Sequence, residues 1–139
     1  IDSGGILFGS DTAAANTLND YEEGTWTPDL RRNDGSVSAS FNVNNATYVK
    51  IGSIVVLKAF INSITAGSSN GSAYWRINGV PYASAVQDYS GEALAYNSTG
   101  ANNVYVGDAG GNLILCNNSN VWTQGLSGQF MLNITYRVV

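Results

Sequence analysis

The chain has 139 residues, of which 44% are apolar and only 12% are charged, with a formal net charge of −4. The length is that of one domain, and so little charge argues against an all-helical fold, because exposed helices depend on Glu, Lys and Arg. The six basic residues are spread along the chain, so phosphate neutralisation and therefore nucleic-acid binding are not expected.

Two residue types exclude whole classes of site. The absence of histidine excludes Ser-His-Asp and Cys-His catalysis and histidine-containing zinc sites. The single cysteine, Cys116, excludes an intrachain disulfide.

Residues 108–112 lack the alternating acidic ligands of an EF-hand loop, so a hairpin turn is expected there. We expect no cofactor and no bound metal, although an oxygen-ligated ion such as calcium is not excluded by composition.

No apolar run approaches the roughly 18 residues of a membrane helix, so membrane insertion is not expected. The chain begins with Ile1 rather than Met, and we expect it to be part of a longer protein.

Residues 1–24 differ from the rest of the chain. A short apolar strand is predicted at residues 4–9, and residues 11–20 are the only stretch suited to a helical turn or two. One strand and one short helix cannot bury their own apolar side chains, so this segment needs the main body or another copy of the chain as a partner. We therefore predict an N-terminal trimerising neck or linker at residues 1–24 and a head domain at residues 25–139.

From residue 25 onward, alternating or dense apolar segments separated by Gly, Asn and Ser predict strands. The predicted strands span residues 26–30, 46–51, 54–64, 72–77, 92–96, 103–106, 113–116 and 127–138. Pro28 suits the first of them only at a sheet edge, because proline has no N–H to donate. The Gly52-Ser53 pair predicts a turn. The pattern predicts an all-β fold, an antiparallel β-sandwich that is jelly-roll-like with a short N-terminal strand or helix segment.

Three segments resemble one protein family. Residues 18–28, LNDYEEGTWTP, resemble the segment LxDYEEGTWTP common in tail fibres and tailspikes of tailed bacteriophages. Residues 48–52, YVKIG, and residues 77–82, INGVPY, resemble the YTKIG hairpin and the I-x-G-L-P-F element of the same proteins, in the same order. The departures from the family pattern keep its size and apolar character; they are Val49, Val80 and Tyr82.

The resemblance implies a homotrimeric C-terminal β-sandwich module that follows upstream fibre domains of the same chain. It further implies adsorption to a bacterial cell-surface polysaccharide or lipopolysaccharide, and a place in the virion tail after synthesis in the host bacterial cytoplasm. The alternative is a purely structural trimerisation or folding cap of a fibre, or of a depolymerase whose active site lies upstream. The residues predicted at a trimer interface are Ile6, Leu7, Phe8, Leu18, Tyr21 and Trp26.

Carboxylates are the only acid–base groups suited to catalysis, and Asp20, Glu22, Glu23 and Asp29 lie together at the entry to the predicted sandwich. A glycosidase needs two carboxylates that face each other across a sugar. The alternative that we favour is a turn at Glu22-Glu23 that caps a helix or binds the backbone of a neighbouring subunit. We therefore predict that the chain is not an enzyme.

The aromatic and amide side chains favour sugar binding instead, because Tyr and Trp stack on sugar faces and Asn amides bind hydroxyls. The candidate ligand-binding residues fall in the part of the chain that the resemblance covers least; they are Tyr96, Asn102, Asn112, Asn117, Asn118, Asn120 and Trp122. The alternatives are ordinary turns for the Asn-rich loops and a core or interface role for other aromatics, namely Trp26, Tyr48, Trp75, Tyr105 and Tyr136.

Overall fold

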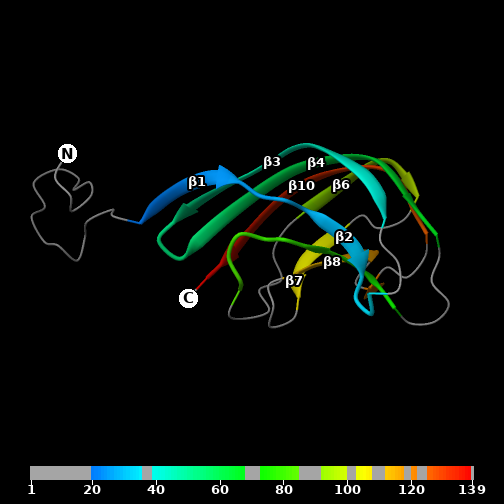
Figure 1. Ribbon diagram of the computed structural model, residues 1–139. Coiled ribbons are helices and arrows are strands. Elements are labelled where there is room, and N and C mark those ends of the chain that lie inside the picture. The colour runs from blue at the N-terminus through cyan, green and yellow to red at the C-terminus, as the bar shows by residue number, and fades with distance from the viewer. Residues whose placement is uncertain are drawn as a thin grey trace, which may run out of the picture.

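The described part of the chain is built from antiparallel β-strands. The computed structural model describes residues 20–35, 39–67, 73–84, 92–99, 103–107, 112–117, 120–121 and 125–138, with the backbone alone for residues 92–99, 103–107, 115–117 and 120–121. These residues form ten strands and no helix (Figure 1). The strands are β1 Tyr21–Thr25, β2 Asp29–Arg32, β3 Ser40–Ile51, β4 Ile54–Ala66, β5 Trp75–Asn78, β6 Glu92–Thr99, β7 Asn103–Gly107, β8 Asn112–Asn117, β9 Asn120–Val121 and β10 Leu126–Arg137. The predicted all-β, antiparallel fold is confirmed.

The strands follow one hydrogen-bonded path, β1-β3-β4-β10-β6-β7-β8-β5-β2, with β9 paired to β8. Figure 1 shows this path folded into two layers, with β1, β3, β4, β10 and β6 in one layer and β2, β7 and β8 in the other. The hydrogen-bonded path passes from the first layer to the second between β6 and β7, where Glu92 pairs with Asn103. Two antiparallel layers of this kind are consistent with a β-sandwich.

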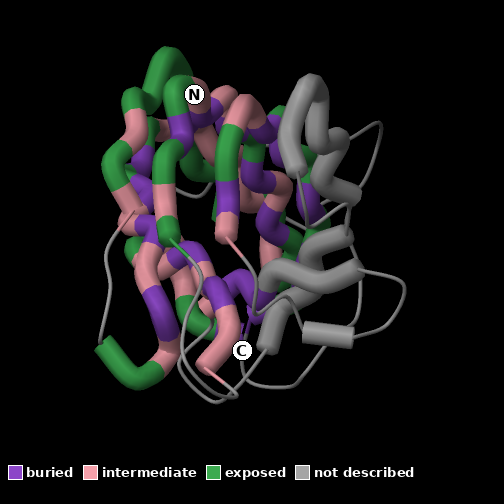
Figure 2. The backbone as a smooth tube through the Cα atoms, turned by 90° about the vertical axis from the view of Figure 1, so that its right-hand side faces the viewer, coloured by how far each residue is buried: buried purple, intermediate pink, exposed green. Residues whose placement is uncertain are grey.

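Buried and non-buried residues alternate along β4. The four buried residues that it contributes to the core are Val55, Leu57, Ala59 and Ile61. Period-2 alternation places these four side chains on one face. In Figure 2 buried residues alternate with half-buried and exposed ones along the strands. The facing residues of β10 and of the second layer complete the core; they include Leu30, Trp75, Ile77, Leu113, Phe130, Leu132, Ile134 and Tyr136.

A β-bulge in β4 shifts the phase of this alternation. Ser63 has a φ of 53°, in the left-handed region. From Ile61 to Ile64 the strand advances three residues while its partner β10 advances two, from Phe130 to Gly128. The extra residue returns Ile64 to the buried face, where it is 2% exposed.

The adjacent arginines of β2 have opposite environments because neighbouring strand residues point to opposite faces. Arg31 forms an ion pair with Asp29 at the surface. Arg32 is fully buried, with its guanidinium carbon 4.3 Å from the centroid of the Trp75 ring. Its Nη1 donates to the carbonyl of Ala73 at 2.5 Å and its Nη2 to that of Gly67 at 3.2 Å. Burial lowers the pKa of Arg32, and the ring and carbonyls compensate the buried cation.

The prediction of one strand over residues 26–30 is wrong. β1 ends at Thr25 and β2 begins at Asp29, so residues 26–28 cross between the layers and Pro28 lies outside both strands. A crossing is compatible with proline because no ladder hydrogen bond is lost there. The sheet also starts at Tyr21, inside the predicted neck, because β1 pairs with β3. The two-residue strand β9 was not predicted.

Candidate functional site

The register between β1 and β3 assembles a polar cluster on the inner side of the first layer. Glu22 lies opposite Lys50, and Gly24 lies opposite Tyr48. The next partners of Lys50 and Tyr48, on β4, are the buried residues Val55 and Leu57. Cross-strand partners point to the same face, so these β1 and β3 side chains line the margin of the core. Together with Asp20 and Tyr82 we call Glu22, Tyr48 and Lys50 the tyrosine–carboxylate cluster.

Glu22 is the centre of this cluster. The hydroxyl of Tyr48 donates to its Oε1 at 2.5 Å, and the hydroxyl of Tyr82 also favours its ionised form. The two hydroxyls therefore lower the pKa of Glu22, with the Tyr48 hydrogen bond as the larger cause. Glu22 in turn raises the pKa of Tyr48 and of Tyr82, because each phenol would have to ionise beside a carboxylate.

The aromatic rings fix the geometry of these donors. The Tyr48 and Tyr82 rings meet edge to face, with centroids 5.6 Å apart and planes at 78°. Lys50 forms an ion pair with Asp20, and its Nζ lies 5.6 Å from the centroid of the Tyr82 ring. Edge-to-face pairs and a cation over a ring are both favourable arrangements.

Tyr136 attaches Tyr82 to the core. Its hydroxyl donates to the carbonyl of Tyr82 at 2.8 Å, and its ring is 1% exposed. Burial raises the pKa of Tyr136 to about 12. The segment that follows β5 is therefore held at its backbone by β10 and at the Tyr82 ring by Tyr48 of β3.

Two glycines permit these contacts. A Cβ on Gly24 would lie 2.9 Å from Cε1 of Tyr48, so the bare backbone of β1 leaves room for the ring. A Cβ on Gly79 would lie 2.1 Å from the carbonyl oxygen of Thr27, and Gly79 has a φ of +85°. The turn after β5 therefore passes directly against residues 26–28, which links the first resembling segment to the third.

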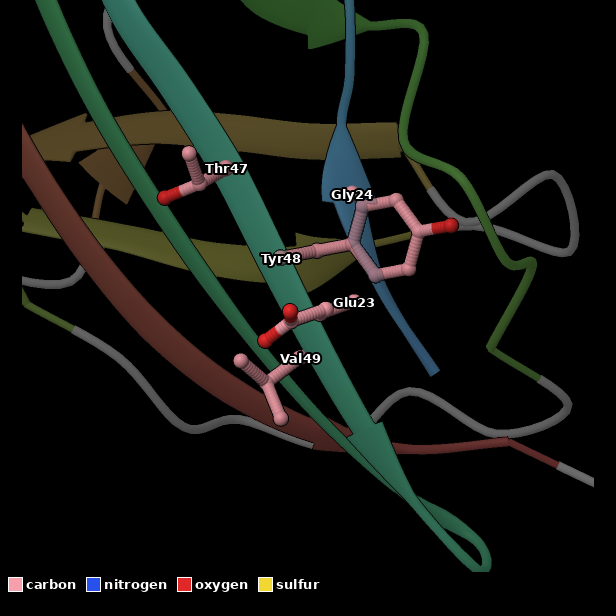
Figure 3. A pocket seen from close by; sticks show the side chains of 5 residues that line it. All are labelled: Glu23, Gly24, Thr47, Tyr48 and Val49. Carbon is pink, nitrogen blue, oxygen red and sulfur yellow. The ribbon is translucent and has the colours of Figure 1, made fainter. Parts of the chain in front are cut away.

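An open hollow lies beside the cluster, at the edge formed by β1 and β3. It has a volume of about 420 Å³ and is lined by Glu23, Gly24, Thr47, Tyr48 and Val49. Figure 3 shows the Tyr48 ring extending from β3 over the β1 backbone at Gly24, with Glu23 and Val49 close to each other. The hydroxyl of Tyr21 donates to Oε2 of Glu23 at 2.7 Å.

The expected turn at Glu22-Glu23 is therefore wrong. Both residues lie on β1, where successive side chains point to opposite faces. Glu22 belongs to the cluster, whereas Glu23 lines the hollow. Because β1 is paired to β3 along its whole length, the Glu22-Glu23 pair is part of a strand and does not form a turn.

The structure divides the predicted ligand-binding residues. Asn117 and Asn120 are cross-strand partners, whereas Asn112 lies at the other end of β8, about 16 Å away at the usual rise of a strand. Tyr96 is on β6, in register with Gln129 of β10. Asn102, Asn118 and Trp122 lie outside the described residues. Among the predicted ligand-binding residues that the structure describes, Asn117 and Asn120 are the pair brought together.

The predicted interface residues are divided as well. Ile6, Leu7, Phe8 and Leu18 lie outside the described residues. Tyr21 is 55% exposed, which suits a contact surface. Trp26 is 7% exposed, and its Nε1 donates to the carbonyl of Lys58 at 3.2 Å. Trp26 therefore belongs to the core of one chain, which is the alternative role considered for it.

The tyrosine–carboxylate cluster was not predicted as a unit, although each of its members lies in a segment quoted for the resemblance. The available signal was an acidic pair in the first segment together with tyrosine and lysine side chains in the other two. Comparison with family models, characterised proteins and solved structures finds no match to this chain.

Proposed function

We propose that this chain is a distal C-terminal module of a phage tail fibre or tailspike, which trimerises and recognises a glycan of the host bacterial surface during adsorption. The observation that carries the proposal is the convergence of Glu22, Tyr48 and Tyr82. These residues come from three segments that resemble that family and are separated along the chain. A motif match gains weight when its members meet in a consistent structural context, and here the three segments form one contact network.

The proposal includes a jelly-roll-like sandwich in the virion tail. The sequence order of the strands supports this connectivity, because the chain passes from one layer to the other several times. It does so between β1 and β2, β2 and β3, β4 and β5, β5 and β6, β6 and β7, and β9 and β10. None of the described residues forms a helix long and apolar enough to cross a membrane.

We propose recognition rather than catalysis for the acidic residues. The general acid of a glycosidase has a raised pKa, whereas hydrogen bonds from tyrosine lower that of Glu22. Glu22 and Glu23 point to opposite faces of β1, so they do not flank one cavity. Among the residues that the structure describes, no group of three or more Cys, Asp or Glu is placed to hold a metal ion.

A structural trimerisation cap is the second candidate function. Tyr21, Ile51 and Ile54 favour it, because they expose apolar surface that a binding module alone does not need. The tyrosine–carboxylate cluster also joins the edge strand β1 to the segment after β5, which is a stabilising role. The two candidate functions are compatible in one module.

The test is binding of residues 1–139 to a glycan array and to host cells, followed by the same assays on variants. Because Asn117 of β8 and Asn120 of β9 are cross-strand partners, we expect Asn118→Ala, Asn120→Ala and Trp122→Ala to weaken binding. A lost stacked ring or amide bond of about 0.5–1.5 kcal/mol corresponds to a loss of about twofold to tenfold. Asn42→Ala is the matched control, because Asn42 is an exposed asparagine of β3 outside the predicted ligand-binding residues. Unaltered adsorption by all of these variants would favour the structural cap.

A further inference from the structure

The outer face of the first layer carries a continuous apolar area. Tyr21, Ile51 and Ile54 are successive cross-strand partners on β1, β3 and β4, and they are 55%, 47% and 40% exposed. Val49 and Val56 form the next outward row of partners on β3 and β4. Apolar side chains exposed side by side in this way mark interaction surfaces more often than scattered ones do. We call these five residues the outer patch.

Opposite charges flank the outer patch. Glu23 lies on the edge strand β1 and is exposed. Lys58 on β4 and Arg137 on β10 are exposed on the same face as the outer patch. Lys58 lies opposite Thr47, which is two residues before Val49 on β3, and Arg137 lies opposite Ile54. The ion pairs within the described part of the chain involve other side chains, namely Arg31 with Asp29 and Lys50 with Asp20.

This arrangement makes the face complementary to itself. The acidic edge on β1 lies two strand spacings from β4 and three from β10, or about 10 and 14 Å from the two basic strands. When the β1 edge of one copy meets the β4–β10 side of another, opposite charges come together and the apolar rows cover each other. The hollow beside Glu23 adds a concave acceptor at the acidic edge.

We infer that the chain associates with further copies of itself through the outer patch, with Glu23 of one copy facing Lys58 and Arg137 of the next. The inference rests on the proposed function for the existence of a homotrimer, and it assigns the surface that holds the subunits together. Tyr21, predicted from the sequence at a trimer interface, belongs to this surface.

Sedimentation of residues 1–139 over a concentration series tests the apolar part of the surface. We expect Ile51→Asn to raise the concentration at which half of the chains are assembled by about tenfold or more. Val43→Asn is the matched control, because Val43 is also an aliphatic residue of β3 and is 40% exposed, but it lies about 26 Å along the strand from Ile51. Equal effects of the two variants, or a wild-type protein that remains monomeric, would overturn the inference.

Charge reversal tests the orientation of the copies. We expect Glu23→Lys alone and the pair Lys58→Glu with Arg137→Glu alone to weaken assembly. A single chain that carries all three substitutions, Glu23→Lys with Lys58→Glu and Arg137→Glu, should assemble, because the reversed charges again meet opposite charges at every contact between copies. Failure of this triple variant to assemble, while it unfolds at the wild-type denaturant concentration, would contradict the proposed contact.

The two levels of the proposal fail separately. An oligomer that is sensitive to these variants but binds neither glycan nor host cells refutes the proposed recognition function and leaves the contact surface in place. A wild-type oligomer that binds host cells, and whose assembly all of these variants leave unchanged, refutes the contact surface alone.

Discussion

Replacement of Gly79 by alanine tests whether the contact between the turn after β5 and residues 26–28 determines the fold. Gly79 has a φ of +85°, a conformation that costs an L-residue about 1–2 kcal/mol. The new Cβ would lie 2.1 Å from the carbonyl oxygen of Thr27, where contacts under 3.0 Å essentially never occur. Backbone must therefore move, at a further cost of about 1–3 kcal/mol. We expect a total loss of about 2–5 kcal/mol from the free energy of unfolding.

Gly35→Ala is the matched control for this substitution. Gly35 has a φ of +74°, yet nothing lies within 4 Å of a Cβ built there. The control should therefore lose only the conformational part, about 1–2 kcal/mol. Urea unfolding followed by tryptophan fluorescence measures both variants, because Trp26 and Trp75 are 7% and 0% exposed. Equal unfolding midpoints for the two alanine variants would refute the reasoning, since the clash with Thr27 would then carry no cost.

Three further predictions concern the buried and clustered polar groups. The pKa of Glu22 in the folded protein is lowered from its ordinary value of 4.5. The ionised Glu22 carboxylate therefore stabilises the fold above pH 4.5, and this stabilisation is lost as the pH falls through the folded pKa. When the unfolding midpoint is measured over an acid titration, Glu22→Gln and Tyr48→Phe should show a shallower decline toward low pH than wild type. Tyr136→Phe should lower the free energy of unfolding by about 1–2 kcal/mol, because the Tyr82 carbonyl loses its donor, and a loss near zero in denaturant titration would mean that water replaces the hydroxyl. Arg32→Lys should lower the free energy of unfolding by about 2–3 kcal/mol, since an ammonium cannot stack on Trp75 while it also reaches the carbonyls of Ala73 and Gly67. A thermal unfolding temperature equal to that of wild type would contradict this prediction.

The sequence by itself determined the fold class and most strands, because strand formation leaves a local signature. The alternation in residues 54–64 and 127–138 predicts two long strands, and β4 and β10 contain them. The Gly52-Ser53 turn was also predictable from a local signature, the turn-forming residue pair itself. In the structure Gly52 lies between β3 and β4 with a φ of +57°. Burial of Trp75 and Tyr136 follows from their size and apolar surface.

The tertiary structure alone decided how distant segments meet. Nothing local marks residues 26–28 as a crossing between layers, or places the extra residue of the bulge at Ser63. The pairing of Glu22 with the hydroxyl of Tyr48 depends on a register that joins residues 26 positions apart. The opposite directions of Glu22 and Glu23 depend on β1 being a strand rather than a turn. Register and layer crossings are set by the packing of the whole core, and a sequence pattern records only the side chains that each strand brings to it.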